Sequence, residues 1–135
     1  MEQVTICMKK AGENKINWQD FRQVRQLLLK EKAYREKQLR ARALEKAQAV
    51  ADWLKGRYNV KEVYLYGSLA WGKFTPQSDI DLLIVGFPNN SCFWDMQVKA
   101  EEMALPFPVS IVCAEDAVES LRKRVFREGI RIAWS

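Results

Sequence analysis

The chain of 135 residues contains no histidine. Histidine is the usual side chain for general acid–base catalysis near neutral pH and a frequent ligand of zinc. Its absence excludes Ser-His-Asp triads, His-ligated zinc sites and histidine general bases. Carboxylates are the main metal ligands that remain, so the composition leaves open chemistry that depends on a carboxylate-bound metal.

Cysteine is also scarce, and the chain lacks the segments that direct a protein to a membrane. Cys7, Cys92 and Cys113 are odd in number, scattered and without metal-binding spacing, so we expect reduced and mostly structural thiols. No apolar run approaches the ~20 residues of a membrane span, and the N-terminus lacks the features of a signal peptide. We therefore expect a soluble cytoplasmic protein with no membrane partner.

Charge is distributed unevenly along the chain. The length of 135 residues suits a single domain with one hydrophobic core. Residues 1–57 contain 14 Lys and Arg against 7 Asp and Glu, which gives +7, whereas residues 58–135 contain 8 against 10, which gives −2; the sum is the net charge of +5. The basic residues of the N-terminal part are interleaved with acids rather than arrayed on one face. This pattern argues against nucleic acid as a partner.

The most informative segment, residues 64–85, reads YLYGSLAWGKFTPQSDIDLLIV. A Gly-Ser pair, Gly67 and Ser68, ends one short β-rich run, and a triplet from Asp79 to Asp81 begins the next. The ten residues between Ser68 and Asp79 leave room for a turn and a short helix before the chain returns to an adjacent strand. We expect the two ends of the segment to meet.

These residue types suit a phosphate and metal site. Gly67 allows a sharp turn close to a ligand, and Ser68 stands where a helix N-terminus offers free N–H groups to an anion. On a strand, Asp79 and Asp81 share one face, about 7 Å apart. Their charges raise each other's pKa unless Mg²⁺ and a nucleoside triphosphate turn the repulsion into coordination. Each half alone has an ordinary interpretation, a turn or a pair of solvated acids, but together they favour a functional site.

The Gly-Ser pair, the spacer and the Asp-x-Asp pair resemble the motif of the minimal nucleotidyltransferases (MNT) of the DNA polymerase beta-like superfamily. The resemblance covers about residues 43–135, including the closing segment REGIRIAWS. It implies an α/β (α+β) fold with a small mixed sheet flanked by helices. It also implies Mg²⁺- or Mn²⁺-dependent transfer of a nucleoside monophosphate from ATP, with release of pyrophosphate. Proteins of this kind often act as the antitoxin of a HEPN-domain toxin and adenylylate a tyrosine on it.

The first departure from this family is at Ser110. The family usually carries a third carboxylate on a later strand, and the corresponding stretch here, residues 108–112, has Ser110 at that position. The resemblance implies that the third acid helps to hold the metal that activates the attacking hydroxyl, whereas the Asp pair holds the metal that accompanies the triphosphate. Without the third acid, the chain can therefore still bind the nucleotide when transfer is slow or absent. Glu115 or Asp116 could substitute only if the strand end folds back toward the site.

The second departure lies in the turn, where the family commonly has Ala-Arg-Gly and this chain has Ala70-Trp71-Gly72. Trp71 either stacks on a base or packs over the sheet edge. Lys73 either supplies positive charge to the phosphates as a mobile cation or remains in solvent. We count Lys73 and Ser78 among the candidate nucleotide-binding residues, together with the Gly-Ser pair.

The N-terminal part predicts a long helix, because Asn17 can cap it and neither Gly nor Pro interrupts it before Gly56. Its middle, residues 30–42, is sparse in apolar residues, so we expect this part to face solvent. The pairs spaced for i,i+4 ion pairing are Glu31 with Arg35 and Glu36 with Arg40. The residues expected to pack on the sheet are Ala43, Leu44, Ala47, Val50, Ala51, Leu54 and Tyr58.

A second apolar stripe lies upstream, at Trp18, Phe21, Val24, Leu27 and Leu28. It invites a partner, either a second copy of the chain or another protein. Alternatively, it folds back over its own core after a break near residues 30–34. We assign residues 1–42 to a mostly helical N-terminal extension and residues 43–135 to the nucleotidyltransferase domain, and we assign no function to residues 1–16.

After the motif, the pattern predicts a helix over residues 93–104, a strand over residues 107–113 and a helix over residues 115–128 that Gly129 ends. Little chain remains for an acceptor-binding domain. Three functions follow. The chain is an active nucleotidyltransferase with a protein or small-molecule acceptor, a pseudoenzyme that binds nucleotide or a partner, or, least favoured, a nucleic-acid-binding module.

Overall fold

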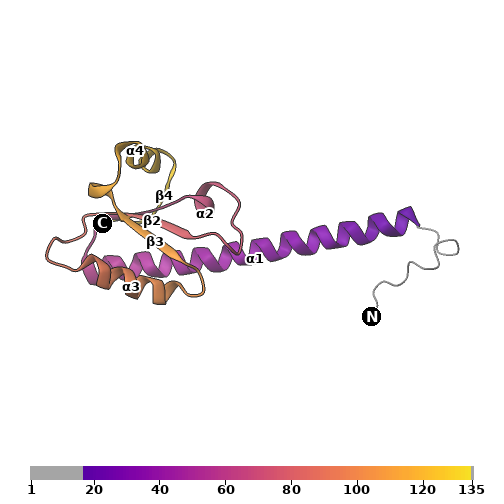
Figure 1. Cartoon of the computed structure of the whole chain (residues 1–135), viewed down its shortest axis with the longest axis horizontal. Coiled ribbons are helices and arrows are strands. Elements are labelled where there is room, and N and C mark those ends of the chain that lie inside the picture. The colour runs from indigo at the N-terminus through magenta and orange to yellow at the C-terminus, as the bar shows by residue number, and fades with distance from the viewer. Residues whose placement is uncertain (1–16, 135) are drawn as a thin grey trace. The chain divides into compact units, whose positions relative to one another are not determined.

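The computed structural model describes residues 17–134 (Figure 1). Cys7 and the rest of residues 1–16 lie outside the described residues. The chain divides into two compact units, of which the first ends at Arg35 and the second begins at Glu36.

One mixed four-stranded sheet forms the centre of the second unit. Its strands have the order β3-β2-β1-β4. β1 pairs antiparallel with both β2 and β4, whereas β2 pairs in parallel with β3. The bounds are β1 Glu62–Tyr66, β2 Ile80–Val85, β3 Val109–Cys113 and β4 Ile130–Trp134. The small mixed sheet that the resemblance implies is therefore confirmed.

One face of this sheet carries the main hydrophobic core. The C-terminal part of α1 (Trp18–Tyr58) and helix α3 (Phe93–Ala104) cover it, as Figure 1 shows. Because side chains alternate along a strand, every second residue of β1, β2 and β3 enters this core. The strand residues in it are Val63, Leu65, Ile80, Leu82, Ile84, Val109, Ile111 and Cys113.

The opposite face carries a smaller cluster and the candidate site. Helix α4 (Glu119–Glu128) packs there, and its fully buried Val125 contacts the cluster that contains Leu83 of β2 and Ala114. The short helix α2 (Ser68–Trp71) adds Trp71 to the same cluster. The candidate site therefore lies on the face of the sheet that α1 leaves uncovered, which α2 and α4 share.

Helix α1 confirms most of the expectations for the N-terminal part. Asn17 caps it through Oδ1, which accepts from the N–H groups of Gln19 and Asp20 at 3.0 and 3.3 Å. Arg35 pairs with Glu31 at 3.8 Å. The helix is continuous from Trp18 to Tyr58, so the proposed break near residues 30–34 is absent.

Two expectations for α1 were wrong. Leu44 is 38% exposed, whereas the other six residues expected to pack on the sheet are buried. Leu44 lies next to the buried Ala43, on the edge of a narrow apolar stripe, and therefore turns toward solvent. Glu36 pairs with Lys73 at 3.4 Å, not with Arg40 as its spacing suggested.

The C-terminal elements differ from the prediction in their starting points. Helix α3 has the expected bounds, but β3 begins at Val109 rather than at residue 107, because Pro108 has no N–H for the ladder. The helix predicted from residue 115 is a 3₁₀ turn, Ala114–Asp116, followed by α4 from Glu119. Val118 is extended and precedes the first turn of α4, so the chain changes direction before the helix begins.

None of the helices within residues 17–134 combines the length and the apolar character that a membrane span requires.

Candidate active site

The first half of the site is the junction between β1 and α2. Gly67 has a φ of +79°, a conformation that glycine adopts readily, and this turn directs the chain from the sheet into α2. The Gly67 carbonyl accepts from the N–H groups of Ala70 and Trp71 at 3.0 and 2.8 Å. The predicted turn and short helix after the Gly-Ser pair are therefore present, with Ser68 as the first residue of α2.

The second half of the site lies directly beside the first. Tyr66, which precedes Gly67, is the cross-strand partner of Asp81 in β2. A Cβ atom built on Gly67 would overlap the Asp81 carboxylate. The two ends of the motif meet as expected, and they meet so closely that a side chain at position 67 has no room.

A hydrogen-bonded turn delivers the Asp pair to this position. Ser78 N–H donates to the Thr75 carbonyl at 2.9 Å, and the Ser78 hydroxyl accepts from Thr75 N–H at 3.0 Å. The two hydroxyls are 3.1 Å apart. Ser78 thus closes the turn that leads into Asp79, and its role in nucleotide binding stays a prediction.

The two carboxylates differ in their surroundings. Asp79 precedes β2 and is exposed, whereas Asp81 lies within β2 and is only partly exposed. Partial burial, with a further contribution from the Asp79 charge, raises the pKa of the Asp81 carboxyl from 3.8 to about 6. The pKa of the neighbouring Tyr66 phenol is also raised, by burial first and by the Asp81 charge second.

This electrostatic arrangement fits a divalent cation. The charge of Asp79 lies near the partly buried Asp81 carboxylate. A cation bound there would offset both the burial and the charge repulsion that raise the pKa of Asp81. Mg²⁺ is commonly held by one or two carboxylates together with the phosphates of a substrate. Asp79 and Asp81 offer that donor set, and Asp81 lies directly beside the backbone turn at Gly67.

Ser110 occupies the position beside Asp81 on the next strand. The two residues are direct partners in the parallel pairing of β2 and β3, and adjacent strands lie about 4.8 Å apart. A carboxylate at position 110 would therefore stand next to Asp81 on the same face. Within the described residues 17–134, no group of three or more Cys, Asp or Glu side chains is placed to hold a metal.

Glu115 and Asp116 do not replace the missing acid. They follow Cys113, which pairs with Ile84, three residues beyond the Asp81 pairing and thus about 10 Å further along the sheet. Glu115 accepts from Gly86 N–H at 3.3 Å at that far end. The strand does not fold back, so the suggested substitution is wrong.

Trp71 is packed between α2 and α4. Its Nε1–H donates to the Glu128 carbonyl at 2.8 Å, and the Arg124 guanidinium lies 4.1 Å from the centre of the indole ring. Arg124 also pairs with the Glu128 carboxylate at 3.1 Å. With one ring face and the N–H engaged, the geometry supports the packing interpretation over stacking on a base.

Lys73 points to a different neighbour. Its ammonium pairs with Glu36 of α1 at 3.4 Å, and both side chains are partly or largely exposed. Release from this exposed pair would cost little, so the predicted role of Lys73 as a phosphate ligand is compatible with the structure and stays a prediction.

Three residues near the site were missed in the sequence. Tyr66 precedes Gly67 and so had to face the same side of the sheet as Asp81, a relation that strand alternation could have indicated. Arg124 and Glu128 have i,i+4 spacing, which predicts their ion pair. Nothing in that spacing predicts that the pair would hold Trp71, because the contact joins residues far apart in the chain.

Comparison with known proteins places these observations in a wider group. The model of the family described as polymerase beta, nucleotidyltransferase matches residues 48–134, more than half of the chain. A search of curated proteins found no matching sequence.

Several solved structures share the fold. A toxin–antitoxin structure with AMP-PNP is 22% identical, with a TM-score of 0.55, and the match covers 67% of this chain and 73% of that one. A mutant of the toxin–antitoxin MntA-HpeT is 18% identical, with a TM-score of 0.54 and the same coverage. A protein described as a candidate minimal nucleotidyltransferase is 27% identical, with a TM-score of 0.51, covering 64% of this chain and 90% of that one.

Proposed function

Because the chain belongs to the polymerase beta nucleotidyltransferase family, we propose that it transfers AMP from ATP to a hydroxyl of a protein or small molecule, with Mg²⁺ or Mn²⁺. The observation that carries the proposal is the close approach of Gly67 and Asp81, which brings the Gly-Ser turn beside the segment that holds both carboxylates. The proposal includes a cytoplasmic location, where ATP and Mg²⁺ are available.

Each site residue has a defined part in this proposal. Gly67 and Ser68 hold the triphosphate through the turn and the start of α2, while Asp79 and Asp81 hold the metal that accompanies it. Ser78 keeps the turn before Asp79 closed. As the residue next to Asp79, it also contacts the nucleotide. Lys73 provides a cation once it leaves Glu36.

The reaction is a substitution at the α-phosphorus. The acceptor oxygen forms a bond to this atom, the bond to the bridging oxygen of the β-phosphate breaks, and pyrophosphate leaves with the electron pair. The acceptor hydroxyl gives up its proton to water. The metal supplies charge neutralisation for the triphosphate, and the chain's own contribution is to bind and align the nucleotide at the Gly-Ser turn.

A second candidate function is nucleotide or partner binding without transfer. The observation in its favour is Ser110, which stands beside Asp81 where an acid would complete a triad of carboxylates. Without that acid, the acceptor hydroxyl lacks a nearby carboxylate to assist its deprotonation. The pair Asp79 and Asp81 would still bind the nucleotide with its metal.

The proposed protein partner is a HEPN-type helical toxin, with this chain as the antitoxin. Solved structures described as toxin–antitoxin complexes support this proposal through their shared fold. The apolar stripe of α1, which is exposed at Trp18, Phe21, Val24, Leu27 and Leu28, supports contact either with such a partner or with a second copy. Light scattering of the isolated chain separates self-association from the need for a different partner.

Transfer of label from α-phosphate-labelled ATP tests the proposed reaction. With Mg²⁺ and a lysate of the source cell, wild type should label an acceptor, and Asp79→Asn should not. Positioned proton acceptors contribute about 10²–10⁴-fold to rates, so Ser110→Asp should increase labelling at least tenfold if Ser110 limits the reaction. Absence of label from wild type and from Ser110→Asp, with Mg-ATP binding intact, would contradict transfer and favour the binding function.

A further inference from the structure

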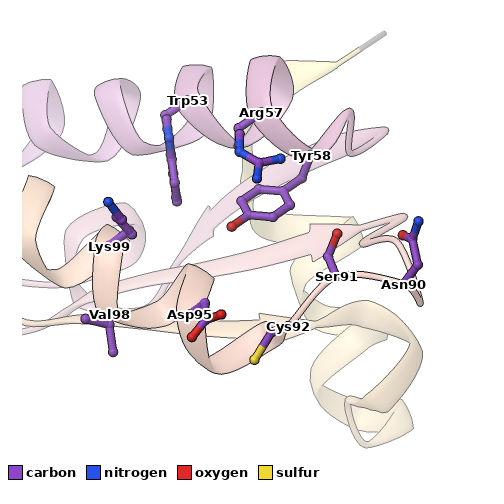
Figure 2. A pocket seen from close by; sticks show the side chains of 9 residues that line it. All are labelled: Trp53, Arg57, Tyr58, Asn90, Ser91, Cys92, Asp95, Val98 and Lys99. Carbon is purple, nitrogen blue, oxygen red and sulfur yellow. The ribbon is translucent and has the colours of Figure 1, made fainter.

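A hollow lies on the other side of the sheet from the candidate active site. It has a volume of about 680 Å³ and lies between the end of α1, the loop before α3 and the first turns of α3. The lining residues labelled in Figure 2 are Trp53, Arg57, Tyr58, Asn90, Ser91, Cys92, Asp95, Val98 and Lys99. Ligand sites for small molecules typically have volumes of about 300–1,000 Å³.

The sheet separates this hollow from the Asp pair. Helices α1 and α3 cover the face that carries the main core, whereas Asp81 and Tyr66 point to the opposite face. The loop that lines the hollow follows the C-terminal end of β2, and Asp79 precedes its N-terminal end. A ligand in the hollow would therefore not contact the candidate metal ligands.

Aromatic side chains form one wall of the hollow. Trp53 and Tyr58 pack edge to face, with ring centroids 5.4 Å apart, and Figure 2 shows both projecting from α1 toward α3. Tyr58 is almost fully buried, whereas Trp53 is partly exposed. The exposed part of the indole lines the hollow and can contact a ring there.

Three charged side chains surround this wall without ion-pair partners in the described part of the chain. Arg57 lies 5.0 Å from the centre of the Tyr58 ring, and Lys99 and Asp95 extend from α3. Within residues 17–134 no salt bridge includes any of the three. Two cations therefore remain available for an anion, and one carboxylate for a hydroxyl or amine donor.

We propose that this hollow is a second binding site for a nucleoside monophosphate, distinct from the site for the transferred nucleotide. The ring stacks on Trp53, Arg57 and Lys99 bind the phosphate, and Asp95 accepts from a ribose hydroxyl or a ring amine. Asn90 and Ser91 add polar groups at the loop side of the hollow.

The combination of groups selects this ligand class over simpler ones. An inorganic anion would use the two cations but would leave the indole uncovered and stand near the Asp95 charge. A purely apolar ligand would leave all three charges unused. A nucleoside monophosphate has a flat ring, hydrogen-bond donors and an anion in one molecule, and so matches all three features of the lining.

Titration calorimetry of the full-length chain with AMP tests this site. Every protein in this experiment carries Asp79→Asn and Asp81→Asn, and EDTA removes divalent cations. These two measures suppress binding at the candidate active site. We expect saturable binding of one AMP per chain. Arg57→Glu and Lys99→Glu should each weaken it at least about tenfold, since a hydrogen bond to a charged group is worth about that much.

Arg42→Glu is the matched control, because Arg42 is exposed on the same helix and does not line the hollow. It should leave AMP affinity unchanged within about twofold. Adenosine and inorganic phosphate, each with half of the recognised groups, should bind at least tenfold more weakly than AMP. Absence of saturable AMP binding, an affinity insensitive to Arg57→Glu and Lys99→Glu, or phosphate binding as tight as AMP would overturn the proposal.

Discussion

Gly67 is the residue on which the geometry of the candidate site depends most directly. Its positive φ and the adjacent Asp81 carboxylate leave no space for a side chain. Asp81 depends in turn on its neighbours, since burial and the Asp79 charge together raise its pKa. At the scale of single residues, the site is thus a close contact between a glycine and a carboxylate that lacks a compensating charge.

Gly67→Ala should destabilise the fold and impair nucleotide binding. An L-residue in the left-handed region costs about 1–2 kcal/mol, and the displaced Asp81 carboxylate adds to that cost. Chemical denaturation measures the free energy of unfolding. Gly56→Ala is the control, because a Cβ there meets nothing within 4 Å and alanine in a helix is favoured over glycine by about 0.5–1 kcal/mol. Equal stability of Gly67→Ala and wild type would contradict the close contact.

Asp81 should make the stability of the metal-free protein depend on pH. Because its pKa is raised from 3.8 to about 6 in the folded state, the folded protein binds this proton more tightly than the unfolded chain does. This contribution to stability is fully present below about pH 4 and is lost as the pH rises through about 6. Solvent screening at a half-exposed carboxyl reduces its size.

Melting temperatures between pH 4.5 and 8 test this expectation. The loss of stability that wild type shows as the pH rises through about 6 should be absent in Asp81→Asn. Above pH 6, Mg²⁺ should restore the stability of wild type. A difference between wild type and Asp81→Asn that stays constant across this range would show that the pKa of Asp81 is not raised.

At the scale of elements, the contact between α2 and α4 fixes the turn that the site uses. Trp71 joins the two helices through its bond to the Glu128 carbonyl and through the Arg124 guanidinium on its ring. Trp71 stands where an arginine is common in the family, and its ring contacts Arg124 of the distant helix α4, which also pairs with Glu128.

Trp71→Phe should weaken this contact without removing the aromatic ring. The lost hydrogen bond is worth about 1 kcal/mol, measured as a change in the free energy of unfolding. Trp94→Phe is the control, because Trp94 is 71% exposed and its loss should change stability by less than about 0.5 kcal/mol. A Trp71→Phe protein as stable as wild type would show that the bond to Glu128 contributes nothing.

The elements also show which parts of the fold local sequence could predict. α3 has the predicted bounds, because its helical apolar pattern is flanked by clear loop residues. The start of α4 was misplaced, because residues 114–118 have ordinary helical composition and only the tertiary fold makes them a 3₁₀ turn, Ala114–Asp116, and two extended residues. Leu44 was misplaced for a related reason: helical spacing alone does not give the width of the buried stripe.

At the scale of the whole molecule, the sheet separates the two candidate sites. The Asp pair lies on the face beside α2 and α4, and the aromatic hollow lies between the end of α1, the loop before α3 and the first turns of α3. The first could be predicted, because a motif within one segment of chain encodes it. The hollow could not, because it combines residues of α1 with residues some 40 positions later, and only packing of the two helices brings them together.

The central claim is that Gly67, Asp79 and Asp81 form a metal-dependent site for ATP. Its most direct test is calorimetric titration of ATP into wild type and Asp79→Asn, with and without Mg²⁺, after circular dichroism has shown that the variant is folded. The account predicts saturable ATP binding to wild type that requires Mg²⁺ and is lost in Asp79→Asn. Equal ATP affinity of the two proteins, or binding that is indifferent to Mg²⁺, would contradict it.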